Sequence, residues 1–538
     1  MMKKLQDEIR EKNRSFEEFD RHSEIRDGEL IRYYGNETDV TVPDGVTIIA
    51  SGAFRGCRKL TSVTLGRGVT SIHDGAFQDC VRLRQVTFPT GLHEIGEYAF
   101  LRCESLVTLS LPRTVYIIGK AAFQRCGALK KVMLPSSLAS LGAYAFSDCR
   151  SLEEVILPEG LDAIHRSCFF QCTALRHIHI PESVRTIGSY AFALCSGLCD
   201  INLPDGVTYI GTGAFCDCSS LRRFRVPGQV RFVGNELFAG CRHLEDIVLP
   251  DTLTRIGNHC FSACRSLRTV QFPPQLTHIG ESAFLGCTAL SEAVLPERLE
   301  SVGVSAFAYC DGLKTVSLGE TMTAVAREAF LYCRALTAIR LPKTVRTVGE
   351  RAFFGCASLG SVGMPEKLER IDGEAFAETA LERIDLPDSV TAVGKRAFAD
   401  CHRLGTVILP PRQTGIGKGA FAGCGGLEIL VVPDSLLFLH RKMEKWGIPD
   451  ETVPVYHEEL RISTLLAEYA DAETAPERKE ALRGEIRRRI SGLRHKHRRR
   501  GAWNAQEQTA AADAREEAEQ KPVSADGEAV TPKDTSAE

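Results

Sequence analysis

The sequence lacks the segments that would place it in or across a membrane. None of its 538 residues falls in a run of about 18 apolar side chains, the length that spans a bilayer. The first twenty residues carry Lys3 and Lys4, but then Gln6, Asp7 and Glu8 where a secretory signal has an apolar stretch. We therefore expect a cytoplasmic protein, with the cell surface or secretion by a non-standard route as the alternative.

The sequence also lacks the signatures of common catalytic and metal sites. Residues 415–419, GIGKG, have neither the full glycine spacing nor the Lys-Ser/Thr pair of a phosphate loop. The segment 457–459, HEE, has no second histidine, and no nucleophile elbow occurs. The net charge is only −3, so the whole molecule is no generic polyanion binder. We predict no enzymatic activity, no cofactor and no bound metal.

What the sequence does have is a repeat. Phenylalanine recurs every 23 residues from Phe54 to Phe376, and again at Phe398 and Phe421 after one step of 22, which gives seventeen copies. Each copy reads A-F-x-x-C-x-x-L-x-x-[VI]-x-L-P-x-x-[VL]-x-x-[IV]-G-x-x. One such unit cannot bury its own apolar face, but stacked units bury a continuous one. We therefore predict a solenoid.

Within one unit, the pattern predicts short extended segments. The run 106–111 ends in alternating apolar residues, which is typical of a strand with one buried face, and Pro112 ends that strand. A second extended piece is expected at 115–118. Gly119 is expected to permit a tight turn, and Ala122-Phe123 to open a short helical or 3₁₀ segment.

The repeat resembles the leucine-rich repeat family, in its bacterial BspA-like (Treponema pallidum type) subclass, whose 23-residue unit has the same L-x-x-I-x-L-P and I-G-x-x-A-F-x-x-C elements. The resemblance covers residues 40–433. It implies an α/β repeat: a leucine-rich-repeat solenoid of about seventeen rungs, with a parallel β-sheet on the concave face, short second strands and short helical turns elsewhere. It also implies binding, because related proteins are associated with adhesion to host matrix proteins or to other cells.

Cysteine forms a column within the repeat. Sixteen of the twenty cysteines, from Cys57 to Cys424, lie three residues after a repeat phenylalanine. Such a column could bind metal or form a stack of disulfides, but a small buried thiol is the simpler interpretation. Thr379 takes the same slot once, which favours packing over metal binding.

Outward-facing strand positions are the informative ones, because the apolar columns form the core. On three consecutive rungs these positions hold side chains that could contact a ligand: His177, His179, Asp200, Asn202, Arg223 and Arg225. This patch could bind a metal or an anionic or polar partner, or it could be an ordinary solvated surface.

The outward positions turn apolar near the end of the array, at Ile408, Ile429 and Val431. A bare apolar edge favours aggregation or binding. We predict that residues 434–446 cover it as a capping helix that begins at Asp434 or Ser435, with a partner's surface as the alternative.

The segment after this cap is basic. Residues 477–500 contain eleven Lys and Arg against three Glu, with apolar residues spaced to share one helical face. Such a helix could contact nucleic acid phosphates or an anionic membrane, or it could be a solvated helix packed on the preceding segment. The candidate polyanion contacts are Arg487, Arg488, Arg489, Arg498, Arg499 and Arg500.

These observations predict six parts along the chain: a charged helical segment (1–27), a cap hairpin (28–42), the solenoid (43–433), a C-terminal cap with helices (434–475), a basic amphipathic helix (476–500) and a disordered acidic tail (501–538). Our first hypothesis is a non-enzymatic scaffold in a bacterial cell that binds a protein partner on its exposed face. A surface or secreted adhesin, and polyanion or membrane contact through the basic helix, are the alternatives.

Overall fold

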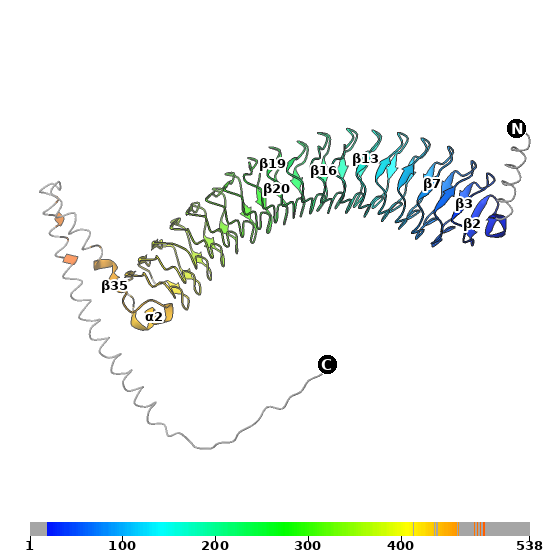
Figure 1. Cartoon of the computed structure of the whole chain (residues 1–538). Helices are drawn as coiled ribbons and strands as arrows, with labels where there is room; N and C mark the ends of the chain where they lie inside the picture. The colour runs from blue at the N-terminus through cyan, green and yellow to red at the C-terminus, as the bar shows by residue number, and fades with distance from the viewer. Residues whose placement is uncertain are drawn as a thin grey trace, which may run out of the picture.

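The chain coils into rungs that stack along a curved arc, from the blue N-terminal rungs to the yellow C-terminal ones (Figure 1). The computed structural model describes residues 19–412, 414–434, 436, 439–459, 461, 478, 481–482, 485 and 488–489. The predicted basic helix lies mostly outside the described residues, and the predicted acidic tail lies wholly outside them. The predicted repeat solenoid is confirmed.

Most rungs carry a longer and a shorter parallel strand. The longer strands are β3 (Asp39–Thr41), β5 (Ser62–Thr64), β7 (Gln85–Thr87), β9 (Thr108–Ser110), β11 (Lys131–Met133), β13 (Glu154–Ile156), β17 (Arg223–Arg225), β19 (Asp246–Val248), β22 (Glu292–Val294), β24 (Thr315–Ser317), β26 (Ala338–Arg340), β28 (Ser361–Gly363), β30 (Arg383–Asp385), β32 (Thr406–Ile408) and β34 (Ile429–Val432). The two-residue strands are β4 (Ile48–Ile49), β6 (Ser71–Ile72), β8 (Glu94–Ile95), β10 (Ile117–Ile118), β12 (Ser140–Leu141), β14 (Ala163–Ile164), β15 (Thr186–Ile187), β16 (Tyr209–Ile210), β18 (Phe232–Val233), β20 (Arg255–Ile256), β21 (His278–Ile279), β23 (Ser301–Val302), β25 (Ala324–Val325), β27 (Thr347–Val348), β29 (Arg370–Ile371), β31 (Ala392–Val393) and β33 (Gly415–Ile416).

Strand register follows the sequence repeat. In β11, Lys131 pairs with Thr108 on one side and Glu154 on the other, so each residue faces its counterpart one repeat away. The middle residue of each three-residue strand points inward, while the first and third point outward. The sheet of longer strands is interrupted: within the described residues, the rungs at 177–179 and 200–202 share only one bridge, between His177 and Asp200.

The repeat phenylalanines form one continuous stack inside the solenoid. Neighbouring rings from Phe54 to Phe421 lie 4.8–5.9 Å apart between centroids and are nearly parallel. At the N-terminal end, Tyr33 lies 5.1 Å from Phe54 and continues the stack. Each ring is covered on both faces only when both neighbouring rungs are present, so the core extends through the whole array.

The segment around each Ala-Phe pair is a series of turns and not the predicted helical or 3₁₀ segment. Around Phe100, the amides of Tyr98, Phe100 and Arg102 donate to carbonyls of the next rung, at 2.7–2.8 Å. The intervening amides of Leu101 and Cys103 donate three residues back. Tyr98 and Arg102 have positive φ, 55° and 60°. Since alternate amides bond to another rung and every fourth residue here is left-handed, no helix can form.

The repeat glycine has a different role from the one predicted. Gly119 is not among the residues with positive φ, so it does not supply a left-handed turn. A Cβ placed on Gly119 would lie 2.6 Å from the backbone nitrogen of Glu97 in the preceding rung. The glycine is therefore required because two rung backbones approach closely at this point.

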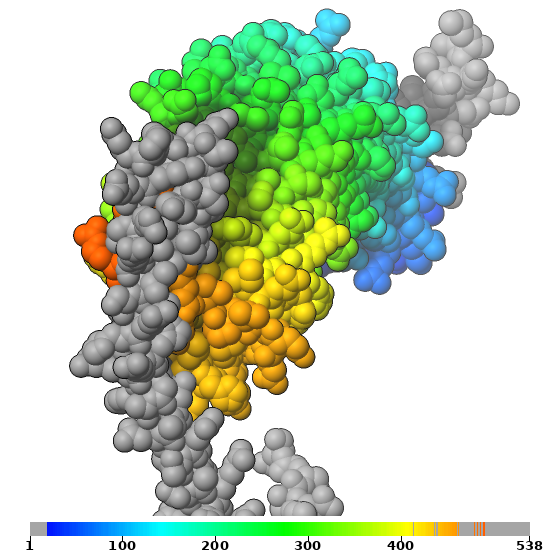
Figure 2. Space-filling view, turned by 90° about the vertical axis from the view of Figure 1, so that its left-hand side faces the viewer, coloured from blue at the N-terminus to red at the C-terminus, as the bar shows by residue number. Residues whose placement is uncertain are grey.

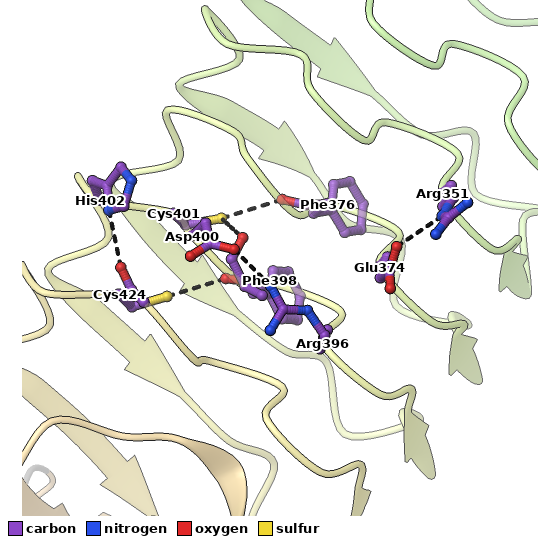
Figure 3. A network of polar contacts seen from close by, with 11 residues as sticks. Arg351, Glu374, Phe376, Arg396, Phe398, Asp400, Cys401, His402 and Cys424 are labelled. Atoms are coloured by element: carbon purple, nitrogen blue, oxygen red, sulfur yellow. Dashed lines mark hydrogen bonds and ion pairs between the residues drawn. The ribbon is translucent and has the colours of Figure 1, made fainter.

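The cysteine column packs into the core through thiol–carbonyl hydrogen bonds. The Cys401 and Cys424 thiols donate to the carbonyls of Phe376 and Phe398 in the preceding rungs, at 3.2 and 3.1 Å (Figure 3). All twenty cysteines are free. Burial raises the pKa of the Cys149 thiol to about 12. The hydroxyl of Thr379 donates instead to Phe376 in its own rung, at 2.9 Å. The column therefore supports the packing interpretation.

A hairpin caps the N-terminal end of the solenoid. β1 (Ser23–Arg26) pairs antiparallel with β2 (Glu29–Tyr33), and the connecting residues Asp27 and Gly28 both have positive φ. An Asp-Gly pair suits this two-residue turn. The hairpin therefore begins at residue 23, inside the segment predicted to be helical. β2 pairs in parallel with β4, so the hairpin is joined to the sheet of short strands.

The C-terminal end is closed by α2 (Leu439–Trp446) and β35 (Val453–Tyr456), shown in orange over the yellow rungs (Figure 2). The carbonyl of buried Trp446 accepts the Phe421 amide at 2.9 Å, as the next rung would. β35 pairs with β34 and covers the edge of the sheet, so Val431 is buried while Ile429 stays exposed. The helix begins five residues later than Asp434. Among the described residues, no helix is both long and apolar enough to cross a bilayer.

Candidate functional site

The strand face is the surface formed by the first and third side chains of the longer strands. These side chains project from a hydrogen-bonded sheet, so their spacing along the array is fixed by the backbone. The inward columns are occupied by core residues with almost no exposure. A partner that binds to this face therefore contacts only the outward side chains.

A stripe of third-position residues on eight consecutive rungs combines apolar ends with a polar centre. Its members are Met133, Ile156, His179, Asn202, Arg225, Val248, Gln271 and Val294. The apolar members are 56%, 42%, 50% and 66% exposed, in chain order. Strands about 4.8 Å apart make this stripe roughly 35 Å long. Methionine and arginine are enriched at protein interfaces, whose fully buried centres are mostly apolar.

The six residues of the predicted patch are all exposed and lie on three neighbouring rungs at the centre of this strand face. His177 and Asp200 occupy the single bridge between their rungs. The His177 ring also lies 3.6 Å, measured at Nε2, from the Cys199 sulfur. The structure therefore brings the six residues onto one surface, where they form the polar centre of the stripe and its first-position neighbours.

Two acidic residues that the sequence interpretation missed contact this patch. Arg225 donates from Nη1 to Asp205 at 2.9 Å, and His179 Nε2 lies 3.9 Å from Glu159. Each acid directly follows a repeat proline, Pro204 or Pro158. An acidic residue after this proline recurs along the chain, and this recurrence is the signal that could have revealed a rim of carboxylates beside the strand face.

Charges of both signs alternate beside the stripe. The Lys131 ammonium lies 2.9 Å from Glu154 on the next rung, next to exposed Met133 and Ile156. Both charged groups are about half exposed, so this pair adds little stability. Its effect is on recognition, because a partner must match a local pattern of charge around an apolar surface.

The patch does not assemble a recognisable metal site. Over the described part of the chain, no group of three His, Cys, Asp or Glu residues has the arrangement to hold a metal ion. His179 and Arg225 instead lie beside Glu159 and Asp205. The arrangement suits hydrogen bonds and ion pairs with a polar partner.

Of the predicted polyanion contacts, only Arg488 and Arg489 are described, and Arg487, Arg498, Arg499 and Arg500 lie outside the described residues. The Arg489 guanidinium is within 3.0 Å of both Glu458 and Glu485. Leu482 is fully buried. Arg489 therefore holds two carboxylates of this chain, an arrangement that competes with contact to an external anion.

Comparison with known families gives one match. The family described as the BspA type leucine rich repeat region matches residues 32–150, 117–245, 231–334 and 323–443. A comparison with curated proteins gives no match.

Solved structures of leucine-rich repeat proteins resemble this chain. One from Bacteroides ovatus is 27% identical, covers 80% of this chain and 94% of its own, and has a TM-score of 0.44. A leucine rich cell surface protein from Faecalibacterium prausnitzii is 24% identical, with 70% and 89% covered and a TM-score of 0.35. The Treponema pallidum leucine-rich repeat protein is 26% identical, with 44% and 82% covered and a TM-score of 0.18.

Proposed function

This chain belongs to the BspA-type leucine-rich repeat family, and we propose from that premise that it is a non-catalytic scaffold whose strand face binds a partner protein. The stripe from Met133 to Val294 is the contact surface in this proposal. Burial of its apolar ends stabilises the complex, while the polar centre at His179, Asn202 and Arg225 determines specificity.

One observation carries this proposal: four aliphatic side chains stay exposed in one column where the neighbouring N-terminal rungs place threonine and serine. Thr64, Thr87 and Ser110 are the third-position residues of those rungs. Polar side chains are thus compatible with the slot, so packing does not require Met133 or Ile156 there. The stripe is about 35 Å long, which is long enough for a standard interface that buries about 800 Å² on each partner.

Affinity capture tests the proposal: the full-length chain is used as bait in an extract of the source cells, and the bound proteins are identified. The variant M133E/I156E places two charges on the exposed column without touching a core residue. We expect a defined protein to be captured by the natural sequence and to be depleted at least tenfold with this variant, as measured by quantitative mass spectrometry.

The matched control is T64E/T87E, which makes the same charge change in the same slot of two other rungs. Capture by this control should equal capture by the natural sequence. If every captured protein is retained equally by M133E/I156E and by the control, the stripe is not the binding surface.

A further inference from the structure

A hollow of about 930 Å³ lies on the strand face beyond the stripe, across β24, β26 and β28. Five of the six outward residues of these strands are small, namely Thr315, Ser317, Ala338, Ser361 and Gly363, and the sixth is Arg340. The sheet is also interrupted here, because β24 pairs with β22 while β26 pairs with β28. Between larger residues on either side, such as Val294 and Arg383, the surface is recessed into a groove.

The groove wall carries cations that no described residue neutralises. Arg340, Lys343 and Lys367 are exposed and have no ion pair with any described residue. The fourth cation, Arg346, pairs with Glu369 at 2.5 Å. Glu366 is the only acidic residue among the described residues that line the groove. Uncompensated positive charge in a recess attracts anionic groups more strongly than the same charge on a convex surface.

The rest of the lining is partly apolar and leaves room for the arginine. Half-buried Val316 and Met364 and buried Pro365 line the groove, and none of the described lining residues is aromatic. A Cβ on Gly363 would lie 3.3 Å from Arg340 Cγ, so glycine allows the Arg340 side chain to lie across that strand. Its planar guanidinium matches a carboxylate with two parallel hydrogen bonds.

We propose that this groove binds an acidic, extended peptide segment of a partner protein. Carboxylates of such a segment match Arg340, Lys343 and Lys367, while its aliphatic groups match Val316, Met364 and Pro365. A single-stranded nucleic acid fits less well, because sites of that kind stack bases on aromatic side chains, which the described lining lacks. This assignment stands apart from the partner on the stripe, since the groove uses other rungs.

The test uses the full chain and a fluorescein-labelled octapeptide of alternating Glu and Leu, with a Gln-for-Glu peptide for comparison. We expect the acidic peptide to bind, to bind at least tenfold more tightly than the Gln peptide, and to weaken as salt is raised. The variant K343E/K367E should weaken binding at least tenfold. A second variant, A338W, fills the groove without a charge change and should have the same effect.

Two controls separate this site from other contributions. R58E/K59E makes the same charge change at exposed residues of a distant rung and should leave binding unchanged. M133E/I156E should also leave it unchanged, so failure of the stripe proposal and failure of this one are distinguishable. Equal binding of both peptides, equal binding by K343E/K367E and R58E/K59E, or no binding at millimolar peptide would overturn the assignment.

The chain's own residues 501–538, with nine acidic and three basic residues, are the competing occupant. If the acidic peptide binds only after these residues are removed, the groove belongs to the chain's own acidic segment and the partner assignment is wrong. If removal leaves the affinity within twofold, the partner assignment is supported.

Discussion

Backbone contact between neighbouring rungs decides which residues fit the repeat glycine slot. A Cβ on Gly211 would lie 2.4 Å from the backbone nitrogen of Ser189, closer than real Cβ atoms come to such an atom. At Gly234, one rung further on, the nearest atom to a Cβ would be the Ile210 carbonyl oxygen at 3.5 Å. The same slot therefore differs in tolerance from rung to rung.

We predict that Gly211→Ala destabilises the protein and Gly234→Ala does not. The added methyl group at Gly211 must push two backbones apart, and overpacking of this kind costs about 1–3 kcal/mol in the free energy of unfolding. At Gly234 the methyl group fits. Alanine also lowers the backbone entropy of the unfolded chain, which stabilises the folded state and offsets the small cost of closer contacts. Urea unfolding of both variants measures the difference. Equal destabilisation would show that close approach is not what selects glycine here.

At the scale of one element, the sequence predicted the strands well and the turn segment badly. The run 106–111 showed the period of two that a half-buried strand requires, and β9 forms there. The left-handed positions gave no such signal, since Tyr98, Arg102 and Asp79 share no chemistry. The residues at these left-handed positions have in common only that none is β-branched, and this shared property cannot be recognised in one repeat alone. A helix was therefore predicted where the rungs exchange hydrogen bonds.

The C-terminal cap shows how an irregular element can replace a rung. Lys445 and Trp446 supply the carbonyls that accept the amides of Gly419 and Phe421. The sequence predicted a covering helix from its apolar residues, but β35 was missed because its segment, VPVY, contains Pro454. A proline is compatible with an edge strand, where its missing donor would face outward.

We predict that Trp446→Ala unfolds the C-terminal end before the rest. Removal of a buried tryptophan costs about 3–5 kcal/mol, and in a repeat protein the effect is confined to neighbouring rungs. Hydrogen exchange should accelerate at Gly419 and Phe421 and stay slow at Phe100. Lys445→Ala is the control, because the exposed side chain is lost while the carbonyl remains. Uniform acceleration along the whole chain would contradict a locally acting cap.

At the scale of the whole molecule, the candidate site was only partly predictable. The polar centre at His179, Asn202 and Arg225 followed from strand register, because outward positions recur at a fixed place in each repeat. The groove did not follow, since it depends on where the sheet is interrupted and on which cations lack partners. Both properties arise between rungs, and a single repeat pattern does not contain them.

The array as a whole should tolerate loss of a complete period and not of a partial one. Deleting residues 269–291 removes 23 residues and joins Arg268 to Glu292, which follow one another in the repeat. Each rung contacts only its neighbours, so we expect the shortened chain to fold, with circular dichroism per residue unchanged and equal resistance to trypsin.

Deleting residues 269–279 is the matched comparison, because it removes eleven residues and leaves the next strand out of phase. An odd shift turns the buried side chains of that strand outward, so the two halves of the solenoid cannot share one Phe stack. We expect rapid trypsin cleavage at the junction and two separate thermal transitions. If both deletions behave alike, the rungs do not depend on a common register, and the rigid spacing on which the stripe and the groove both rely would be lost.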